Sequence, residues 1–154
     1  MNILHEQMMA RAIEEAQKAG QKDEVPVGAV LVGATGDIIA SAHNMIITLR
    51  DPTAHAEILS LRKAAEIENN YRLLNTTLYV TVEPCIMCMG AIVHARVARV
   101  VFGAMDPKWG AAGSLYHFAQ DLRLNHHPEI ISGVREAECR RMMQAFFRTK
   151  RLKT

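Results

Sequence analysis

The sequence predicts an α/β protein in which helices cover both faces of a mixed, roughly five-stranded sheet, a three-layer α/β/α sandwich. Two observations support this class: a hairpin pattern follows an amphipathic helix early in the chain, and strand-like segments then alternate with helical ones. No repeat, low-complexity tract or flexible linker interrupts the 154 residues. We therefore expect a single domain over residues 1–154.

The first half of the chain is expected to form a helix, a hairpin and a second helix. Residues 5–19 place apolar side chains at three- and four-residue spacing, which is typical of an amphipathic helix. The apolar, β-branched run 25–32 and residues 38–42, separated by turn-forming residues, predict the hairpin. A second helical pattern covers roughly residues 54–68, with Thr53 as its expected N-cap.

The second half is expected to continue the alternation of strands and helices. A helix whose start is marked by Pro84 lies between two strands, and a long loop with a short helix near Leu115 precedes a short strand and a final helix. In chain order we expect a strand at residues 77–82, a helix at 85–95, a strand at 99–102, a loop at 103–128, a strand at 129–132 and a helix at 134–148.

Composition excludes several classes of protein. With 49% hydrophobic residues and a net charge of +2, the chain is unlike a disordered, collagen-like or disulfide-scaffold sequence. No apolar run reaches the roughly 18 residues of a membrane span, and the N-terminus lacks the order of a signal peptide, so we expect a cytoplasmic protein without membrane contact. The three cysteines cannot all pair, and a reducing cytosol disfavours disulfides.

Two short motifs at predicted helix starts carry the chemistry of the chain. Cys85 and Cys88, three residues apart in a first helical turn, can direct both sulfurs at one ion. Two thiolates and the imidazole of His55 form a good zinc donor set, and three protein ligands leave a fourth position open to water, as in catalytic sites. Glu57, two residues after His55, could accept and deliver protons there. We expect one Zn²⁺ per chain, although iron or cobalt also suits these donors.

Other interpretations exist for each motif taken alone. A Cys-x-x-Cys pair also suits redox chemistry, and Cys139 could supply a fourth ligand to a structural zinc. The combination of H-x-E with a later P-C-x-x-C, however, is the signature of zinc deaminases. Here the first cysteine follows the glutamate by 28 positions. The combined pattern therefore favours a catalytic zinc site.

Six blocks carry a resemblance to a known family: residues 25–30, 51–57, 82–92, 101–104, 110–114 and 146–151. Together they resemble the bacterial tRNA-specific adenosine deaminases, a family of the cytidine-deaminase-like superfamily, over about residues 5–151. The resemblance implies a cytidine-deaminase-like fold and a homodimer. It also implies hydrolytic deamination of adenosine to inosine, with release of ammonia, at the wobble position of a tRNA anticodon.

The resemblance further implies roles for individual residues. The implied zinc ligands are His55, Cys85 and Cys88, and the implied proton carrier is Glu57. The groups implied to bind the flipped base or its nucleotide are Asn44, the Ala56 amide, the Glu83 carbonyl and Asp106. The expected partner is a tRNA anticodon stem-loop, in which an unpaired base can be splayed into a pocket.

The net charge averages over two unlike regions. Residues 135–154 sum to +5 and the remainder to −3, so we expect a basic C-terminal helix and tail that suits an RNA stem, with a merely solvated tail as the alternative. The candidate RNA contacts are Lys108, Arg148, Lys150 and Arg151. Trp109 and Tyr116 could either stack on nucleotides or pack within the protein.

Two other functions would use the same residues. A deaminase of a free nucleobase or nucleoside, such as guanine, cytosine or cytidine, would keep the zinc chemistry. A non-catalytic RNA-binding subunit would keep the pocket without turnover, although the presence of Glu57 counts against it. For the homodimer, the candidate apolar surface is formed by Met89, Ile92 and Val93.

Overall fold

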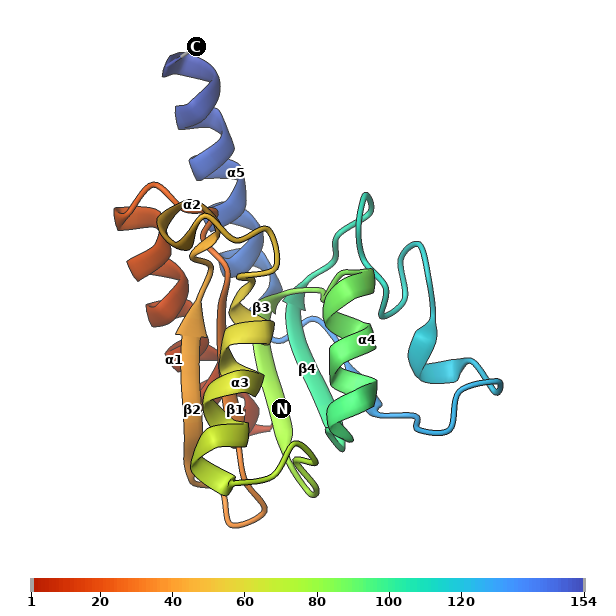
Figure 1. Cartoon of the computed structure of the whole chain (residues 1–154). Coiled ribbons are helices and arrows are strands. Elements are labelled where there is room, and N and C mark those ends of the chain that lie inside the picture. Colours follow the sequence, from red (N-terminus) through yellow and green to blue (C-terminus); the bar gives the residue numbers. More distant parts are fainter. Residues whose placement is uncertain (1, 154) are drawn as a thin grey trace.

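A mixed five-stranded sheet lies at the centre of the structure, a computed structural model that describes residues 2–153 (Figure 1). Its strands are β1 (Gly28–Val32), β2 (Ile38–His43), β3 (Thr77–Val82), β4 (Arg99–Ala104) and β5 (Glu129–Ile131). In space they follow the order β2-β1-β3-β4-β5. Strand β1 pairs antiparallel with β2 and β3, whereas the pairs β3–β4 and β4–β5 are parallel.

Helices cover both faces of this sheet, which confirms the predicted three-layer class. The helices are α1 (Ile3–Gln21), α2 (Ile46–Leu49), α3 (Ala56–Glu68), α4 (Ile86–Ala95), the 3₁₀ helix η1 (Phe118–Gln120) and α5 (Glu136–Lys153). Helices α1 and α5 pack on one face, and α3 and α4 lie together on the other. The C-terminal half of α5 extends past the rest of the molecule (Figure 1).

Burial along the strands follows from this double cover. Strands β1, β3 and β4 are buried along almost their whole length, because both of their faces meet helices. The edge strand β2 alternates between buried and half-buried residues over most of its length. Helix α1 crosses β1 so closely that a Cβ at Gly28 would collide with the backbone of Ala12 and Ala16. Glycine at this position therefore sets the distance between the helix and the sheet.

The structure differs from the sequence expectations in several local details, among them α5, which continues to Lys153 where the sequence predicted an end at residue 148. Helix α2 was not expected, and it begins where the buried Glu24 carboxylate accepts hydrogen bonds from the amides of Ile47 and Thr48. The expectation of Thr53 as the N-cap of α3 is wrong: His55 holds that position, while the Thr53 hydroxyl bonds to Asp51. The short helix expected near residue 115 is η1, a few residues later.

The residues expected to form an apolar dimer surface on α4 belong instead to the core. Met89 and Ile92 are fully buried in the core between the sheet, α3 and α4, and Val93 is 9% exposed. These side chains stabilise the protomer itself. Within residues 2–153, no helix combines the length and hydropathy that a membrane span requires.

Candidate metal centre

His55 and Cys85 occupy the N-cap positions of α3 and α4, which lie beside each other on one face of the sheet. Both have extended backbone conformations, with φ −75° and ψ 153° at His55 and φ −78° and ψ −179° at Cys85. Neither side chain forms the usual cap hydrogen bond. Because N-caps are usually Ser, Thr, Asp or Asn that do form this bond, both side chains are available for another partner.

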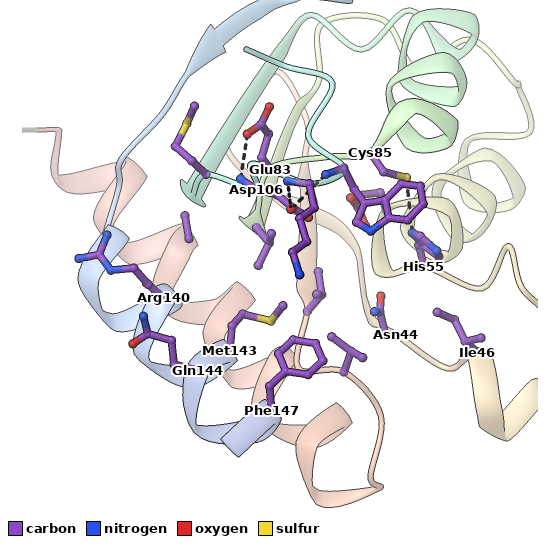
Figure 2. A pocket seen from close by; sticks show the side chains of 18 of the residues that line it. Asn44, Ile46, His55, Glu83, Cys85, Asp106, Arg140, Met143, Gln144 and Phe147 are labelled. Atoms are coloured by element: carbon purple, nitrogen blue, oxygen red, sulfur yellow. Dashed lines mark hydrogen bonds between the residues drawn. The ribbon is translucent and has the colours of Figure 1, made fainter. Parts of the chain in front are cut away.

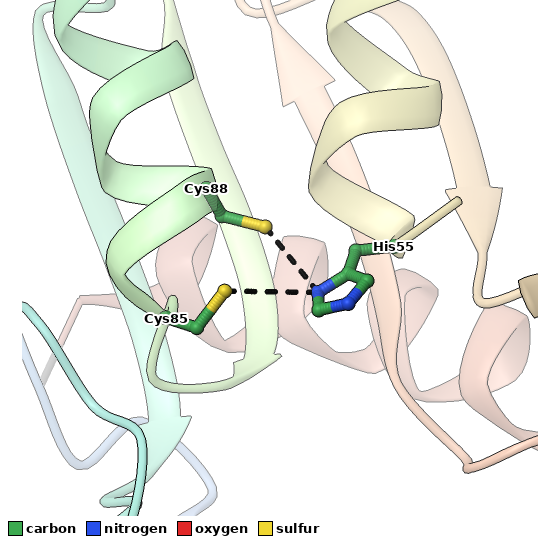
Figure 3. Close-up of side chains that lie close together, drawn as sticks. All are labelled: His55, Cys85 and Cys88. Carbon is green, nitrogen blue, oxygen red and sulfur yellow. Dashed lines mark hydrogen bonds between the residues drawn. The ribbon is translucent and has the colours of Figure 1, made fainter. Parts of the chain in front are cut away.

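Cys88, in the first turn of α4, completes a group of three donors (Figure 3). Nδ1 of His55 lies 3.5 Å from Sγ of Cys88 and 3.8 Å from Sγ of Cys85. The three ligand atoms all lie within 4.8 Å of one another. A tetrahedral zinc with bonds of about 2.0 to 2.3 Å keeps its ligands about 3.5 to 3.8 Å apart. The donor types and their spacing therefore fit one zinc ion.

The electrostatics of this group favour a cation. The pKa of Cys85 is lowered to about 4, first by its hydrogen bond with Cys88 and then by His55, while the pKa of Cys88 is raised by that same bond and by burial. The hydrogen bond with Cys85 likewise raises the pKa of His55. Without a metal, Cys85 is therefore the thiolate and Cys88 the thiol that donates to it. A bound dication would displace the remaining thiol proton, so that both sulfurs could bind as thiolates. The positive ends of α3 and α4 also point to this site and favour thiolate.

Glu57 lies in the first turn of α3 and is 3% exposed. Burial raises its pKa to about 7. Its Oε1 atom is buried and has no hydrogen-bond partner among residues 2–153. Because buried polar atoms are almost always paired, this oxygen marks a place where a water or a ligand belongs. The structure therefore brings Glu57 to the metal group with an oxygen available for proton transfer.

A cavity of about 1320 Å³ opens beside the metal group. Figure 2 shows Met143 and Phe147 of α5 on one side of this space, and His55 and Cys85 on the other. The loop after β2 and the loop of residues 105–114 supply the remaining walls. This volume exceeds the roughly 300–1,000 Å³ of small-molecule sites. The cavity can therefore hold more than one nucleobase.

The structure places three of the four predicted base-binding residues, Asn44, Glu83 and Asp106, around this cavity. Asn44 lines it, and its Oδ1 accepts a hydrogen bond of 2.8 Å from the Ala56 amide. That amide was expected to contact the base, but the structure gives it a partner within the protein. Asp106 also lines the cavity, and its Oδ1 accepts bonds from the amides of Lys108 and Trp109 at 3.1 and 3.2 Å.

All four candidate RNA contacts line the same cavity: Lys108, Arg148, Lys150 and Arg151. Lys150 also forms an ion pair of 2.7 Å with Asp23 and lies over the Phe146 ring. Farther back on α5, Arg140 pairs with Glu136. The basic surface of the cavity is therefore formed by Lys108, Arg140 and the last turns of α5. Thr154 and the side chain of Lys153, which entered the charge count, lie outside the described residues.

Two open alternatives are resolved by position. Cys139 is buried between the sheet and α5, on the face opposite to α3 and α4, so it does not belong to the metal group. Tyr116 stacks on Phe118 at 5.5 Å and an interplanar angle of 11°, whereas Trp109 lines the cavity and is 66% exposed. Of the two aromatic residues, only Trp109 thus lines this cavity.

Sequence reasoning found the basic residues of α5 but missed three of its other cavity-lining side chains. Met143, Gln144 and Phe147 line the cavity, although they lie more than 50 residues from the nearest metal ligand in sequence. The only available signal was the conspicuous Phe-Phe-Arg block at the end of the chain. No local pattern specifies which face of the sheet a final helix covers.

Comparison with known proteins places the chain in a family. Residues 2–104 match the cytidine and deoxycytidylate deaminase zinc-binding region. A Haemophilus influenzae protein named tRNA-specific adenosine deaminase is 53% identical over 95% of this chain and 84% of its own length. A Bacillus subtilis protein of the same name is 52% identical over 94% of this chain and 89% of its own.

Solved structures agree with these sequence matches. One, from a study of A-to-I editing by tRNA:A34 deaminases at the wobble position of transfer RNA, superposes with a TM-score of 0.85. It is 45% identical and covers 88% of this chain and 98% of that one. The three donors, the adjacent glutamate and these matches over nearly the whole chain show that it belongs to the tRNA-specific adenosine deaminase family.

Proposed function

We propose that this protein hydrolyses adenosine to inosine at the wobble position of a tRNA anticodon and releases ammonia. The observation that carries the proposal is the buried, unpartnered Oε1 of Glu57 beside the zinc-type donors of His55, Cys85 and Cys88. The names of the close relatives, tRNA-specific adenosine deaminases, support the same substrate.

In this proposal the three donors bind zinc and Glu57 moves protons. When bound, zinc lowers the pKa of a coordinated water towards neutrality and so supplies the nucleophile for C6 of adenine. Glu57 would accept a proton from the attacking water and deliver it to N1 of the base, and would then pass the proton of the new hydroxyl at C6 to the departing amine, which leaves as ammonia. Burial of Glu57 keeps bulk water from competing for these protons.

The base is held by groups whose orientations the protein fixes. Because Oδ1 of Asn44 is occupied by the Ala56 amide, its Nδ2 group remains to donate to an acceptor on the purine. The Glu83 carbonyl, beside the metal helix, would accept from the base edge. Asp106 and Trp109 lie where the target nucleotide and its neighbour would enter.

The size and charge of the cavity support an RNA substrate over a free base. A flipped nucleotide with its neighbours fills a space that one nucleobase would leave largely empty. Lys108 and the cations at the end of α5 line the same cavity, where they would meet backbone phosphates. We infer that these contacts supply most of the affinity for the stem-loop.

We also infer that residues 1–154 act as one zinc-dependent deaminase domain with a basic C-terminal helix. We further infer that the protein is cytoplasmic and forms a homodimer. The shared sheet with helices on both faces supports the single domain. The presence of tRNA in the cytoplasm supports the location. On α4, Ile86 lines the cavity and is 48% exposed, and a second copy packed beside the cavity would cover it. Light scattering should give twice the chain mass, and one chain mass would contradict the dimer.

The function is tested by substrate choice. The purified protein is incubated with an anticodon stem-loop carrying A at the wobble position, and in parallel with free adenosine, cytidine and guanine. Inosine should form only in the stem-loop. A stem-loop with G at that position is the matched control. Rapid turnover of a free base without turnover of the RNA would show a small-molecule deaminase, and binding without any product would show a silent RNA-binding subunit.

A further inference from the structure

The side chain of Glu83 is bound entirely by one loop of the cavity wall. It is 3% exposed. Its Oε1 accepts from the Asp106 amide at 3.0 Å, and its Oε2 accepts from the amides of Ala112 and Ser114, each at 3.0 Å. The Ser114 hydroxyl donates a further short bond to Oε1. All four donors belong to the loop of residues 105–114.

This loop carries side chains that face the substrate cavity, namely Met105, Asp106, Lys108 and Trp109. The backbone amide of Asp106 donates to Glu83. The side-chain carboxylate of Asp106 in turn accepts from the amides of Lys108 and Trp109. A continuous series of hydrogen bonds thus runs from Glu83 to Trp109. The orientation of this wall therefore depends on the Glu83 carboxylate.

The loop is also packed directly on that carboxylate. A Cβ at Gly110 would collide with the carboxylate of Glu83, so only glycine allows the loop to approach this closely. The Ala111 amide donates to the Pro84 carbonyl at 2.8 Å, and Gly110 pairs with Cys85. The loop is therefore fastened to the segment that leads into the metal helix.

We infer that the Glu83 side chain is a positioning residue for the substrate: it holds the 105–114 loop so that Asp106 and Trp109 face the incoming nucleotide. This role is separate from the base contact proposed for its backbone carbonyl, and it rests on the proposed function. Because the carboxylate reaches neither the reacting atoms nor the metal donors, its loss should weaken substrate binding more than the chemical step.

The position of the loop can be measured without turnover, because Trp109 is the only tryptophan of the chain. In zinc-loaded Glu83→Gln, the new amide group would direct N–H donors at the N–H donors of the loop. The fluorescence anisotropy of Trp109 should then fall by about a third, because a released loop lets the indole move more freely. Glu15→Gln is the matched control, because Glu15 is also a buried glutamate with side-chain partners, Lys18 and His43, that do not line the cavity.

The consequence for the substrate is measured on the same proteins. For Glu83→Gln, KM for the stem-loop should rise about tenfold, with kcat changed less than about threefold and zinc content unchanged. Ser114→Ala, which removes a single donor and should fold in any case, should raise KM by about threefold and lower the anisotropy of Trp109 by a smaller amount.

Unchanged Trp109 anisotropy in both variants would overturn the inference, and Ser114→Ala alone decides it if Glu83→Gln does not fold. A fall in kcat at unchanged KM would also overturn it. Failure of the wild-type protein to deaminate any stem-loop would instead overturn the proposed function, and the anisotropy result would still decide whether Glu83 positions the loop.

Discussion

At the scale of single residues, the metal group depends on two unusual helix caps. Replacing a normal N-cap residue costs about 0.5 to 2 kcal/mol. His55 and Cys85 give up this contribution, because their side chains turn towards each other and towards Cys88. The loss at two helix ends is offset only if a ligand binds there, which explains why the fold keeps such residues at these positions.

The site was predictable from the sequence where the chemistry is local. His55, Glu57, Cys85 and Cys88 follow from motif spacing, because each pair lies within one helical turn. The roles of the Glu83 and Glu24 carboxylates did not follow, because their partners lie 23 to 31 residues away along the chain. Similarly, the use of the Ala56 amide by Asn44 depends on a loop conformation that no pattern specifies.

Glu57→Ala tests the proton carrier. The variant should bind about one zinc per chain, because Glu57 is not among the three donors, but its turnover of the stem-loop should fall by several orders of magnitude. Metal analysis and single-turnover kinetics measure the two effects separately. His94→Ala, an exposed histidine on α4, is the control and should change neither. Near-normal turnover of Glu57→Ala would remove this residue from the mechanism.

At the scale of elements, α2 illustrates a helix specified by a distant side chain. Its four residues are too few to be stable alone. The Glu24 carboxylate accepts from the Ile47 amide at 3.1 Å and from the Thr48 amide and hydroxyl at 2.7 Å. These bonds satisfy donors at the helix start and fix the loop that carries Asn44 and Ile46 into the cavity wall.

Glu24→Gln should therefore lower stability in a pH-dependent way. Burial acts to raise the pKa of Glu24, but the bonds from Thr48 and Ile47 outweigh it, so the folded-state pKa lies below the ordinary 4.5. A lowered folded-state pKa contributes stability above the unfolded-state pKa and loses it as the pH falls through the folded-state value. At pH 7 the variant should lose about 1 to 3 kcal/mol of unfolding free energy.

Urea titrations of both proteins between pH 3 and 8 measure this difference. It should diminish as the pH falls below about 4.5, because glutamine resembles the protonated acid. Glu14→Gln, at an exposed residue of α1, supplies the control and should stay close to wild type at every pH. A difference that does not vary with pH would contradict the role assigned to the ionised carboxylate.

Helix α5 joins the protein core to the substrate cavity. Its first turns pack against β4 and β3, and its last turns carry Phe147 and the basic residues of the cavity wall. Deletion of the residues after Phe147 should raise KM for the stem-loop and flatten its dependence on salt, by about 0.7 in log–log slope for each lost phosphate contact. Arg11→Ala, on an exposed part of α1, is the control. A salt slope equal to that of wild type would show that the tail is only solvated.

At the scale of the whole molecule, the alternation of predicted elements was sufficient for the fold class but not for the strand order. The hairpin and the two parallel crossovers could be anticipated, because each follows from neighbouring segments. The antiparallel contact of β1 with β3 joins segments separated by β2, α2 and α3, and it brings β2, the strand before α3, and β3, the strand before α4, into one sheet. Such a long-range pairing depends on how all the apolar faces pack together.

Removal of the metal should weaken the whole fold, because one ion would connect α3 to α4 across 30 residues of sequence. A ligand present at about a thousand times its Kd stabilises the folded state by about 4 kcal/mol. For a domain of this size, loss of that stabilisation on chelation should lower Tm by ~10 °C. Thermal unfolding monitored by circular dichroism measures this shift in zinc-loaded, chelated and zinc-restored protein. Restoration by zinc but not by magnesium is expected from the thiolate donors.

Cys88→Ala should unfold at the lower temperature with or without zinc, whereas Cys139→Ala should keep the zinc-dependent shift because its thiol lies on the other face of the sheet. Equal Tm values for loaded and chelated wild-type protein would show that the ion makes no contribution to the fold.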